Sequence, residues 1–310
     1  GAARSSVIRV HNICIHARDL HNALHNLPVR CDAEFYACAS ARMMQARNAE
    51  IERGEWTMKI LITGIAGTVG SIVAERLSSA HELSGIDVRP TDQFASRMID
   101  LNDYDAIRPR FDGIDVVIHL AAEPGHGREI GWDILMPRNV QPTANVFQAA
   151  HEAGVRRIVF ASSMHVMGMY EEEEPWRSIA AGEYGDLDPA TVALVSAEAP
   201  VRADGRYAVT KAFGEQLARY YAEAEGMEAI SVRLGTISGN NHPGADARSY
   251  VSWFSHRDLG DFFAACVEKP DIKHAIVYGA SANTWKIYDT PAGWSILGIT
   301  PQDDAEAFRN

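Results

Sequence analysis

Tyr207 and Lys211 have the types and the spacing needed for proton transfer at a hydroxyl group. They are four residues apart in the run Tyr207-Ala208-Val209-Thr210-Lys211, so on a helix both side chains lie on one face. A free tyrosine titrates at about 10, too high for a base at neutral pH, and the charge of Lys211 would lower this pKa. Taken alone, such a pair is more often a solvated helix face.

A serine pair gives the tyrosine and lysine a third partner. Ser162-Ser163 comes directly after the apolar, strand-like residues 157–161 and precedes the predicted helix that carries Tyr207. A serine hydroxyl at a strand end can hold a substrate oxygen while tyrosine removes its proton. By itself a Ser-Ser pair is equally typical of a turn or a helix cap, so the prediction of catalytic Ser163, Tyr207 and Lys211 depends on finding all three with a cofactor site.

A glycine-rich turn supplies that site. Residues 59–63 read as a buried strand and lead into Thr63-Gly64-Ile65-Ala66-Gly67-Thr68-Val69-Gly70, which opens an amphipathic helix. In such a turn Gly64 permits the tight bend, Gly67 lets backbone approach a pyrophosphate, and Gly70 allows close packing, while Thr68 and Val69 lie at the helix N-terminus that faces the anion. Glycine-rich turns are common, but the strand before and the helix after favour a dinucleotide. Its positively charged nicotinamide would further lower the pKa of Tyr207.

Asp87 and two later segments extend the predicted cofactor site. Asp87 ends a second strand 17 residues after Gly70, where a carboxylate can bind the adenosine ribose and repel a 2′-phosphate. This favours NAD over NADP, although Arg89 could favour NADP and Asp87 could be an ordinary strand-end residue. Asp100 and Leu101 are expected on the adenine side. The small residues after the next strand, in Leu120-Ala121-Ala122, would let a cofactor lie against backbone, as tight helix packing would also require.

Strands and helices alternate along the chain from Lys59, as a parallel sheet with helical crossovers requires. Beyond the first strand and helix, further strands are predicted at residues 82–87, 116–120, 157–161, 229–234 and 275–278, with helices at residues 139–153 and 207–225. About seven strands in this order predict an α/β fold: a doubly wound parallel sheet of the Rossmann type with a small C-terminal substrate-binding portion, all within residues 58–310.

Charge and cysteine content exclude several classes of partner. Residues 58–310 hold 22 basic and 35 acidic residues, with only five lysines. Such an acidic surface disfavours nucleic acid and anionic membranes as partners and is compatible with a salt-adapted source. No run of 18 apolar residues exists, which argues against a membrane span. Cys266 is the only cysteine after residue 57, so a reducing cytoplasm is the expected location.

Residues 1–57 are predicted to be an irregular and non-native extension. Translation is expected to start at Met58, because Arg53-Gly54-Glu55 can be encoded by a ribosome-binding purine run. The region carries four histidines and Cys14, but their spacing does not follow one helix face and no Cys-x-x-Cys pair exists. We therefore predict no metal site.

The motifs together resemble the extended short-chain dehydrogenase/reductase family, which includes NAD-dependent epimerases and dehydratases, and within it the uronate dehydrogenases. The likeness covers most of residues 58–310. It is carried by residues 157–168 (RIVFASSMHVMG), 202–215 (RADGRYAVTKAFGE), 252–258 (SWFSHRD), 278–283 (YGASAN) and 297–308 (LGITPQDDAEAF).

The resemblance implies an NAD-dependent oxidoreductase that oxidises a uronate-type sugar at C1 to a lactone. Ser163, Tyr207 and Lys211 match the family's catalytic triad. Leu234 and Asn139 fall at cofactor contacts, with Asp100 and residues 120–122. His165, Thr236 and Arg248 fall where substrate binds, Arg248 as partner of a carboxylate or phosphate. The plainer alternatives are a strand-end hydroxyl for Thr236, a surface residue for Arg248 and a loop contact for Asn139.

Two departures from the uronate dehydrogenases leave the substrate open. Met164 replaces an asparagine that usually follows the catalytic serine, and residues 169–201 look longer than their counterpart, as an acidic lid or a flexible insert. Glu171 to Glu174 read as a solvated loop. The alternatives are an NAD-dependent glucose-6-phosphate dehydrogenase, a nucleotide-sugar epimerase and a non-catalytic NAD-binding protein. The sequence also leaves open whether the chain forms a homo-oligomer.

Overall fold

Seven parallel strands form one sheet in the order β3-β2-β1-β4-β5-β6-β7. The computed structural model describes residues 57–124 and 130–309, and the predictions for residues 1–56 lie outside this range. The strands are β1 (Lys59–Thr63), β2 (Glu82–Asp87), β3 (Ser96–Met98), β4 (Val116–His119), β5 (Arg157–Ser163), β6 (Glu228–Leu234) and β7 (His274–Gly279). The prediction of a doubly wound parallel sheet is confirmed.

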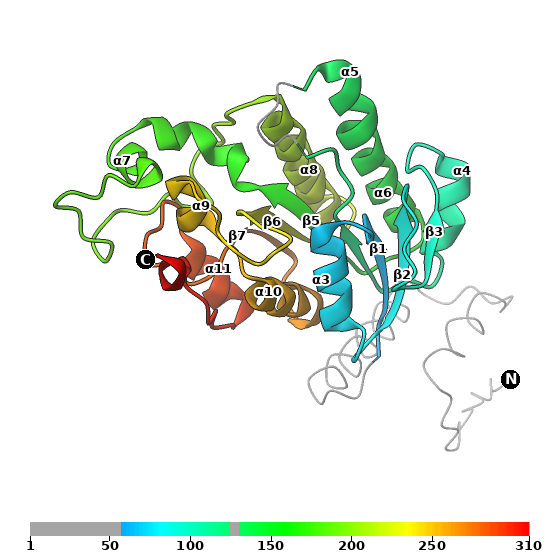
Figure 1. Cartoon of the computed structure of the whole chain (residues 1–310). Helices are drawn as coiled ribbons and strands as arrows, with labels where there is room; N and C mark the ends of the chain where they lie inside the picture. The colour runs from blue at the N-terminus through cyan, green and yellow to red at the C-terminus, as the bar shows by residue number, and fades with distance from the viewer. Residues whose placement is uncertain (1–56, 125–129, 310) are drawn as a thin grey trace, which may run out of the picture. The chain divides into compact units, whose positions relative to one another are not determined.

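Helices cover both faces of this sheet (Figure 1). On one face α3 (Thr68–Leu77) packs against α10 (His256–Glu268), which contacts α11 (Thr290–Leu297). On the other face α4 (Tyr104–Ile107), α6 (Gln141–Glu152) and α8 (Arg206–Glu223) lie side by side. The remaining helical segments are η1 (Arg108–Phe111), α5 (Trp132–Leu135), the π-helical η2 (Met136–Val140), the 3-10 helix η3 (Met164–Glu172), α7 (Trp176–Ala181), α9 (Ala247–Ser252) and η4 (Ala305–Phe308).

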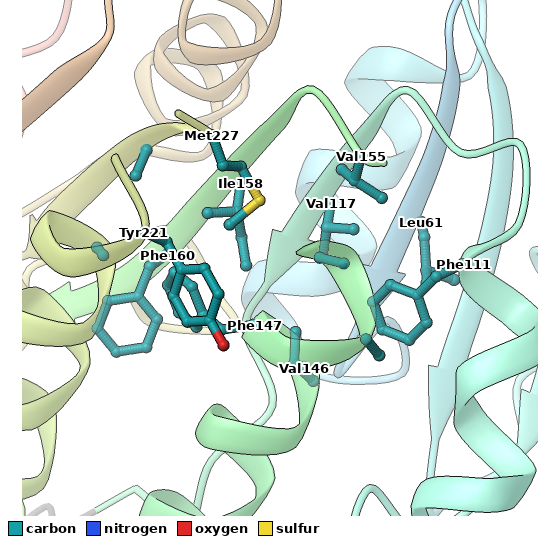
Figure 2. Close-up of a cluster of buried hydrophobic side chains, with 14 of the residues drawn as sticks. Leu61, Phe111, Val117, Val146, Phe147, Val155, Ile158, Phe160, Tyr221 and Met227 are labelled. Carbon is teal, nitrogen blue, oxygen red and sulfur yellow. The ribbon is translucent and has the colours of Figure 1, made fainter. Parts of the chain in front are cut away.

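The central strands are buried on both faces, which explains their near-continuous apolar sequences. Between the sheet and helices α6 and α8, Phe147 stacks on Tyr221 with ring centroids 5.5 Å apart and meets Phe160 of β5 edge-on. Figure 2 shows this cluster, in which Val117 and Ile158 extend the contact across β4 and β5. The core thus fixes α8, the helix of Tyr207 and Lys211, against β5, the strand of Ser163.

A second apolar cluster joins segments that are distant in sequence. Met167 of η3, Ile179 of α7, Val251 of α9 and Tyr288 near the C-terminus are all buried in it. An isolated bridge pairs Val195 with Tyr288. Residues 169–201 therefore pack against the C-terminal portion at Ile179 and Val195, which argues against the flexible-insert alternative for this segment.

Candidate active site

The predicted site residues converge because the parallel strands end at one edge of the sheet. Thr63 at the end of β1 pairs with Ile86 of β2 and His119 of β4. At the end of β5, Ser163 pairs with Leu234 of β6. Residues just beyond these ends form the crevice position at which open α/β sheets bind ligands. We call residues 63–70, 87–89 and 119–122 the cofactor side, and residues 163–171, 204, 236–252 and 288 the substrate side.

The glycine turn of the cofactor side has no room for larger residues. Gly64 has a φ of +77°, and a Cβ there would lie 2.7 Å from the Ala121 nitrogen. A Cβ on Gly70 would lie 2.3 Å from the Gly64 carbonyl oxygen. The turn leads into α3, whose first-turn N–H groups, including those of Thr68 and Val69, have no intrahelical partner. This cradle fits the pyrophosphate of a dinucleotide.

Asp87 braces the glycine turn from the end of β2. Its Oδ2 accepts a hydrogen bond from the Ala66 N–H at 3.0 Å, and its Oδ1 accepts one from the Arg89 N–H at 2.9 Å. The Arg89 guanidinium lies over Gly67, with Nη2 3.6 Å from the place where a Cβ would stand. Asp87 is thus held where a ribose would bind, and Arg89 flanks the same turn.

Asp100 and Leu101 differ in what they offer to a cofactor. Asp100 is exposed, and its carboxylate accepts a hydrogen bond from the Asn102 N–H at 2.9 Å. Leu101 is buried in the core, and its carbonyl accepts a bond from Asn145 Nδ2 at 2.8 Å. The Leu101 side chain therefore serves packing, and any cofactor contact by this pair would come from Asp100 or from backbone.

A buried histidine fixes the segment Leu120-Ala121-Ala122. His119 Nδ1 lies 2.6 Å from Thr63 Oγ1, and Nε2 lies 3.1 Å from Thr143 Oγ1. Burial, aided by the charge of Lys211, lowers the pKa of His119 to about 3, so the ring is neutral. This link joins the ends of β1 and β4 and sets the backbone of Ala121 opposite Gly64.

Close packing of α8 on β5 brings Lys211 to the end of that strand. A Cβ on Gly214 would lie 2.2 Å from the ring of Phe160, so helix and strand meet at a distance that only glycine permits. One turn earlier, Lys211 Nζ donates to the Ala161 carbonyl at 2.8 Å and lies 5.7 Å from the centroid of the Tyr207 ring. A side-chain hydrogen bond joins Tyr207 to Ser163. The structure thus brings Ser163, Tyr207 and Lys211 together.

Burial shifts the pKa values of Tyr207 and Lys211 in opposite directions. Burial raises the pKa of Tyr207 to about 12, opposed by its hydrogen bond with Ser163. Burial lowers the pKa of Lys211 to about 8. In the protein without cofactor, desolvation of the phenolate thus outweighs the stabilising effect of Ser163 on the pKa of Tyr207. The expectation that Lys211 and a nicotinamide ring together lower this pKa stays a prediction.

Two buried polar contacts hold α8 in place. Glu215, one turn after Lys211, accepts one hydrogen bond from Ser162 and forms a bidentate pair with Arg233 of β6, at 2.9 and 2.8 Å. Asn139 accepts a bond from the Glu123 N–H at 2.8 Å and donates to Thr210 of α8 at 3.1 Å. Asn139 therefore joins the loop after β4 to the tyrosine helix. This matches the loop-contact alternative, and its role at the cofactor stays a prediction.

On the substrate side, three predicted contact residues are bound to protein groups. His165 Nδ1 lies 2.6 Å from Asp204 Oδ2, and its ring meets Tyr207 edge-on. Thr236 Oγ1 lies 2.8 Å from Ser252 Oγ. Arg248 of α9 forms a bidentate ion pair with a carboxylate of η3, described below.

The sequence matches the family described as NAD dependent epimerase/dehydratase over residues 60–259. The chain belongs to this family. The predicted family membership and NAD as cofactor are thereby confirmed.

Three similar proteins illustrate the range of activities among its relatives. The chain is 32% identical over 258 residues to NAD-dependent glucose-6-phosphate dehydrogenase from Haloferax volcanii, covering 80% of this chain and 95% of that protein. It is 37% identical over 179 residues to L-arabinose 1-dehydrogenase (NAD(P)(+)) from the same organism, covering 58% and 67%. It resembles the crystal structure of a mutant uronate dehydrogenase from Agrobacterium tumefaciens complexed with NAD, with a TM-score of 0.68, 31% identity, and coverage of 82% and 88%.

In this family member the acidic run at residues 171–174 is not a uniformly solvated loop. The Glu171 side chain is only 12% exposed, and its two oxygens bind Arg248 Nε and Nη2 at 2.6 and 2.9 Å. Tyr288 donates to the same carboxylate at 2.6 Å. The solvated-loop interpretation is wrong for Glu171, because its carboxylate is largely buried and is bound by Arg248 and Tyr288. These partners lie 77 and 117 residues later in the chain, so the local sequence does not indicate the contacts.

Sequence reasoning also missed Asp204 and Glu215. Asp204 lies within the family-like residues 202–215, yet nothing local indicates its contact with His165. For Glu215 a signal existed, since it follows Tyr207 and Lys211 at intervals of four residues on the buried face of α8. Within residues 57–124 and 130–309, no cluster of metal-ligating side chains is found, and no helix is long and apolar enough to cross a membrane.

Proposed function

We propose that this protein is an NAD-dependent dehydrogenase that oxidises C1 of a cyclic aldose to a lactone. The observation that carries the proposal is the meeting of Ser163, Tyr207 and Lys211 at the sheet edge that also presents the glycine cradle. Relatives named as glucose-6-phosphate, arabinose and uronate dehydrogenases support an aldose as substrate.

In the proposed reaction Tyr207 accepts the proton of the C1 hydroxyl while Ser163 holds the C1 oxygen. Lys211 keeps the phenolate of Tyr207 stable through its positive charge. NAD⁺, when bound in the glycine cradle, would supply the acceptor for the hydride from C1. One aldose and one NAD⁺ thus give one lactone, one NADH and one proton.

The cofactor would be held by Gly64, Gly67 and Gly70 at its pyrophosphate and by Asp87 at its ribose. The residues proposed to contact the sugar are Ser163, His165, Thr236 and Arg248, all on the substrate side. Of these, Ser163 is closest to the chemistry because it shares a hydrogen bond with Tyr207.

NADH absorbance in a panel of aldoses, uronates and sugar phosphates, at low and high salt, tests the proposal. We expect NADH and lactone in equal amounts from at least one sugar, with the lactone identified by NMR. An epimerase would change the sugar without net NADH. Failure of every sugar to yield NADH would remove the proposed function.

A further inference from the structure

The guanidinium of Arg248 already has an anionic partner inside the protein. Glu171 occupies its Nε and Nη2 edge with two short hydrogen bonds, the geometry in which arginine binds a carboxylate or phosphate most strongly. The pair is largely sheltered, since the side chains of Arg248 and Glu171 are 27% and 12% exposed. The position expected to receive a substrate anion is therefore filled by a residue of η3.

Glu171 is itself held firmly by the surrounding structure. Tyr288, which is 2% exposed, donates its hydroxyl hydrogen bond to the same oxygen that binds Arg248 Nη2. Tyr288 belongs to the apolar cluster that includes Met167 of η3 and Val251 of α9. Displacing Glu171 would break three hydrogen bonds and leave a desolvated guanidinium, so an incoming anion would have to replace a complete set of contacts.

Two further carboxylates act on Arg248. Asp204 and Asp246 both interact electrostatically with this arginine. With Glu171, three acids thus surround one guanidinium. These three carboxylates and the guanidinium carry a net charge of −2, and the cluster stays negative whether or not His165, the partner of Asp204, is protonated. A second anion entering this cluster would meet net repulsion.

The acidic cluster lies beside the proposed reaction centre. Asp204 binds His165, whose ring centroid is 6.4 Å from that of Tyr207 and whose backbone N–H donates to Ser163. Through Asp204, which also interacts with Arg248, the Glu171 and Arg248 pair is thus connected to the residues proposed to hold the C1 hydroxyl.

We propose that Glu171 is an internal counter-ion of Arg248 that makes the site selective for uncharged aldoses over uronates and sugar phosphates. The proposal rests on the proposed function. Neutral hydroxyls can bind among the carboxylates as hydrogen-bond donors, whereas a substrate carboxylate or phosphate must compete with Glu171 for the guanidinium.

Matched sugars that differ only at C6 test this selectivity. The wild-type protein should give a kcat/KM at least tenfold higher for galactose than for galacturonate, and for glucose than for glucuronate and glucose 6-phosphate. Glu171→Gln removes the charge and keeps the shape, so the ratio of neutral to acidic sugar should fall at least tenfold, mainly through a lower KM for the acidic sugar. Glu172→Gln, at the next and exposed position, should leave the ratio unchanged.

The outcomes separate this inference from the proposed function. NADH formed preferentially from galacturonate or glucose 6-phosphate by the wild-type protein would overturn the selectivity while leaving the dehydrogenase intact. An unchanged ratio in Glu171→Gln would overturn the role of Glu171. If that variant does not fold, calorimetric binding of galactose and galacturonate to the NADH-loaded wild-type protein, which cannot oxidise them, decides, and tighter galacturonate binding would refute the proposal. No NADH from any sugar would instead reject the function itself.

Discussion

The cofactor side and the substrate side of the site are built from different kinds of contact. On the cofactor side, Asp87 accepts hydrogen bonds from backbone N–H groups of Ala66 and Arg89, 21 and 2 residues away. On the substrate side, side chains bind one another across 39 residues for His165 and Asp204 and 77 for Arg248 and Glu171.

This difference indicates which property of the protein depends on each side. The cofactor side is specified by a short glycine motif, and a Cβ at Gly64 or Gly70 would overlap neighbouring backbone. Selectivity can change with one side chain where ion pairs form the site, because the backbone stays in place. We therefore expect changes on the cofactor side to affect NAD binding, and changes on the substrate side to affect the choice of sugar.

Tyr207→Phe should have the largest effect, because Tyr207 lies between the two sides. Loss of the phenol should lower kcat by about 10³-fold, within the range of about 10²- to 10⁴-fold for general acid–base catalysis. The ring remains, so NAD affinity should change little. Stopped-flow NADH formation and NAD titration by fluorescence measure the two quantities.

Tyr220→Phe is the matched control for that variant. Tyr220 lies on the same helix, is 52% exposed and donates its hydroxyl hydrogen bond to Glu225. It should retain wild-type kcat. A kcat for Tyr207→Phe within tenfold of the wild type would mean that another group removes the proton.

Gly70→Ala should impair the cofactor side alone. Its Cβ would overlap the Gly64 carbonyl oxygen, and overpacking of this kind costs about 1–3 kcal/mol. If about 1.4 kcal/mol of this cost falls on the pyrophosphate cradle, NAD affinity should drop about tenfold. The ratio of kcat/KM for galactose and galacturonate should stay constant.

Gly239→Ala provides the comparison for Gly70→Ala, since a Cβ at Gly239 meets nothing within 4 Å. Its Kd for NAD, measured by calorimetry, should equal that of the wild type. A change in sugar selectivity in Gly70→Ala would contradict the expectation that the cofactor side affects NAD binding alone.

The difference between local contacts on the cofactor side and long-range contacts on the substrate side also explains which features the sequence could predict. The first strand, the glycine turn and the start of α3 follow from adjacent residues, and β1 and β2 have the predicted bounds. Tyr207, Lys211 and Ser163 were recognisable because the first two share a helix face and the third ends a strand. Such features depend on local spacing, which a single sequence displays.

Other parts depend on contacts that no local pattern reveals. β3 has three residues with no buried position, and η2 is a π-helix inside an otherwise helical stretch, so neither has a periodic signal. The pairing of Glu171 with Arg248 and Tyr288 arises only when η3, α9 and the C-terminal portion meet in the second apolar cluster. The sequence predicts Arg248 as the partner of a substrate carboxylate or phosphate, which stays a prediction, whereas its carboxylate partner within the protein lies in an acidic run that gave no sign of this contact.

The pH dependence of stability tests whether burial lowers the pKa of Lys211. Its pKa is about 8 in the folded chain and 10.5 when unperturbed, so between these values the unfolded chain binds more protons. The free energy of unfolding should then rise with pH, by about 2 kcal/mol from about pH 8 to 9.5 at about 1.4 kcal/mol per unit. Below about pH 8 the amine is charged in both forms, and this contribution is constant.

Lys211→Met removes the titrating group and should remove this rise. Urea unfolding of both proteins without NAD, at about pH 7.5 and 9.5, gives the difference in pH dependence while staying below the range in which Tyr207 titrates. Adding NAD should reduce the difference if the cofactor's ribose hydroxyls bind the ammonium and stabilise its charged form. Equal pH dependence of the two proteins would mean that the Lys211 ammonium is as well solvated in the folded protein as in the unfolded chain, and that its hydrogen bond to Ala161 compensates fully for burial.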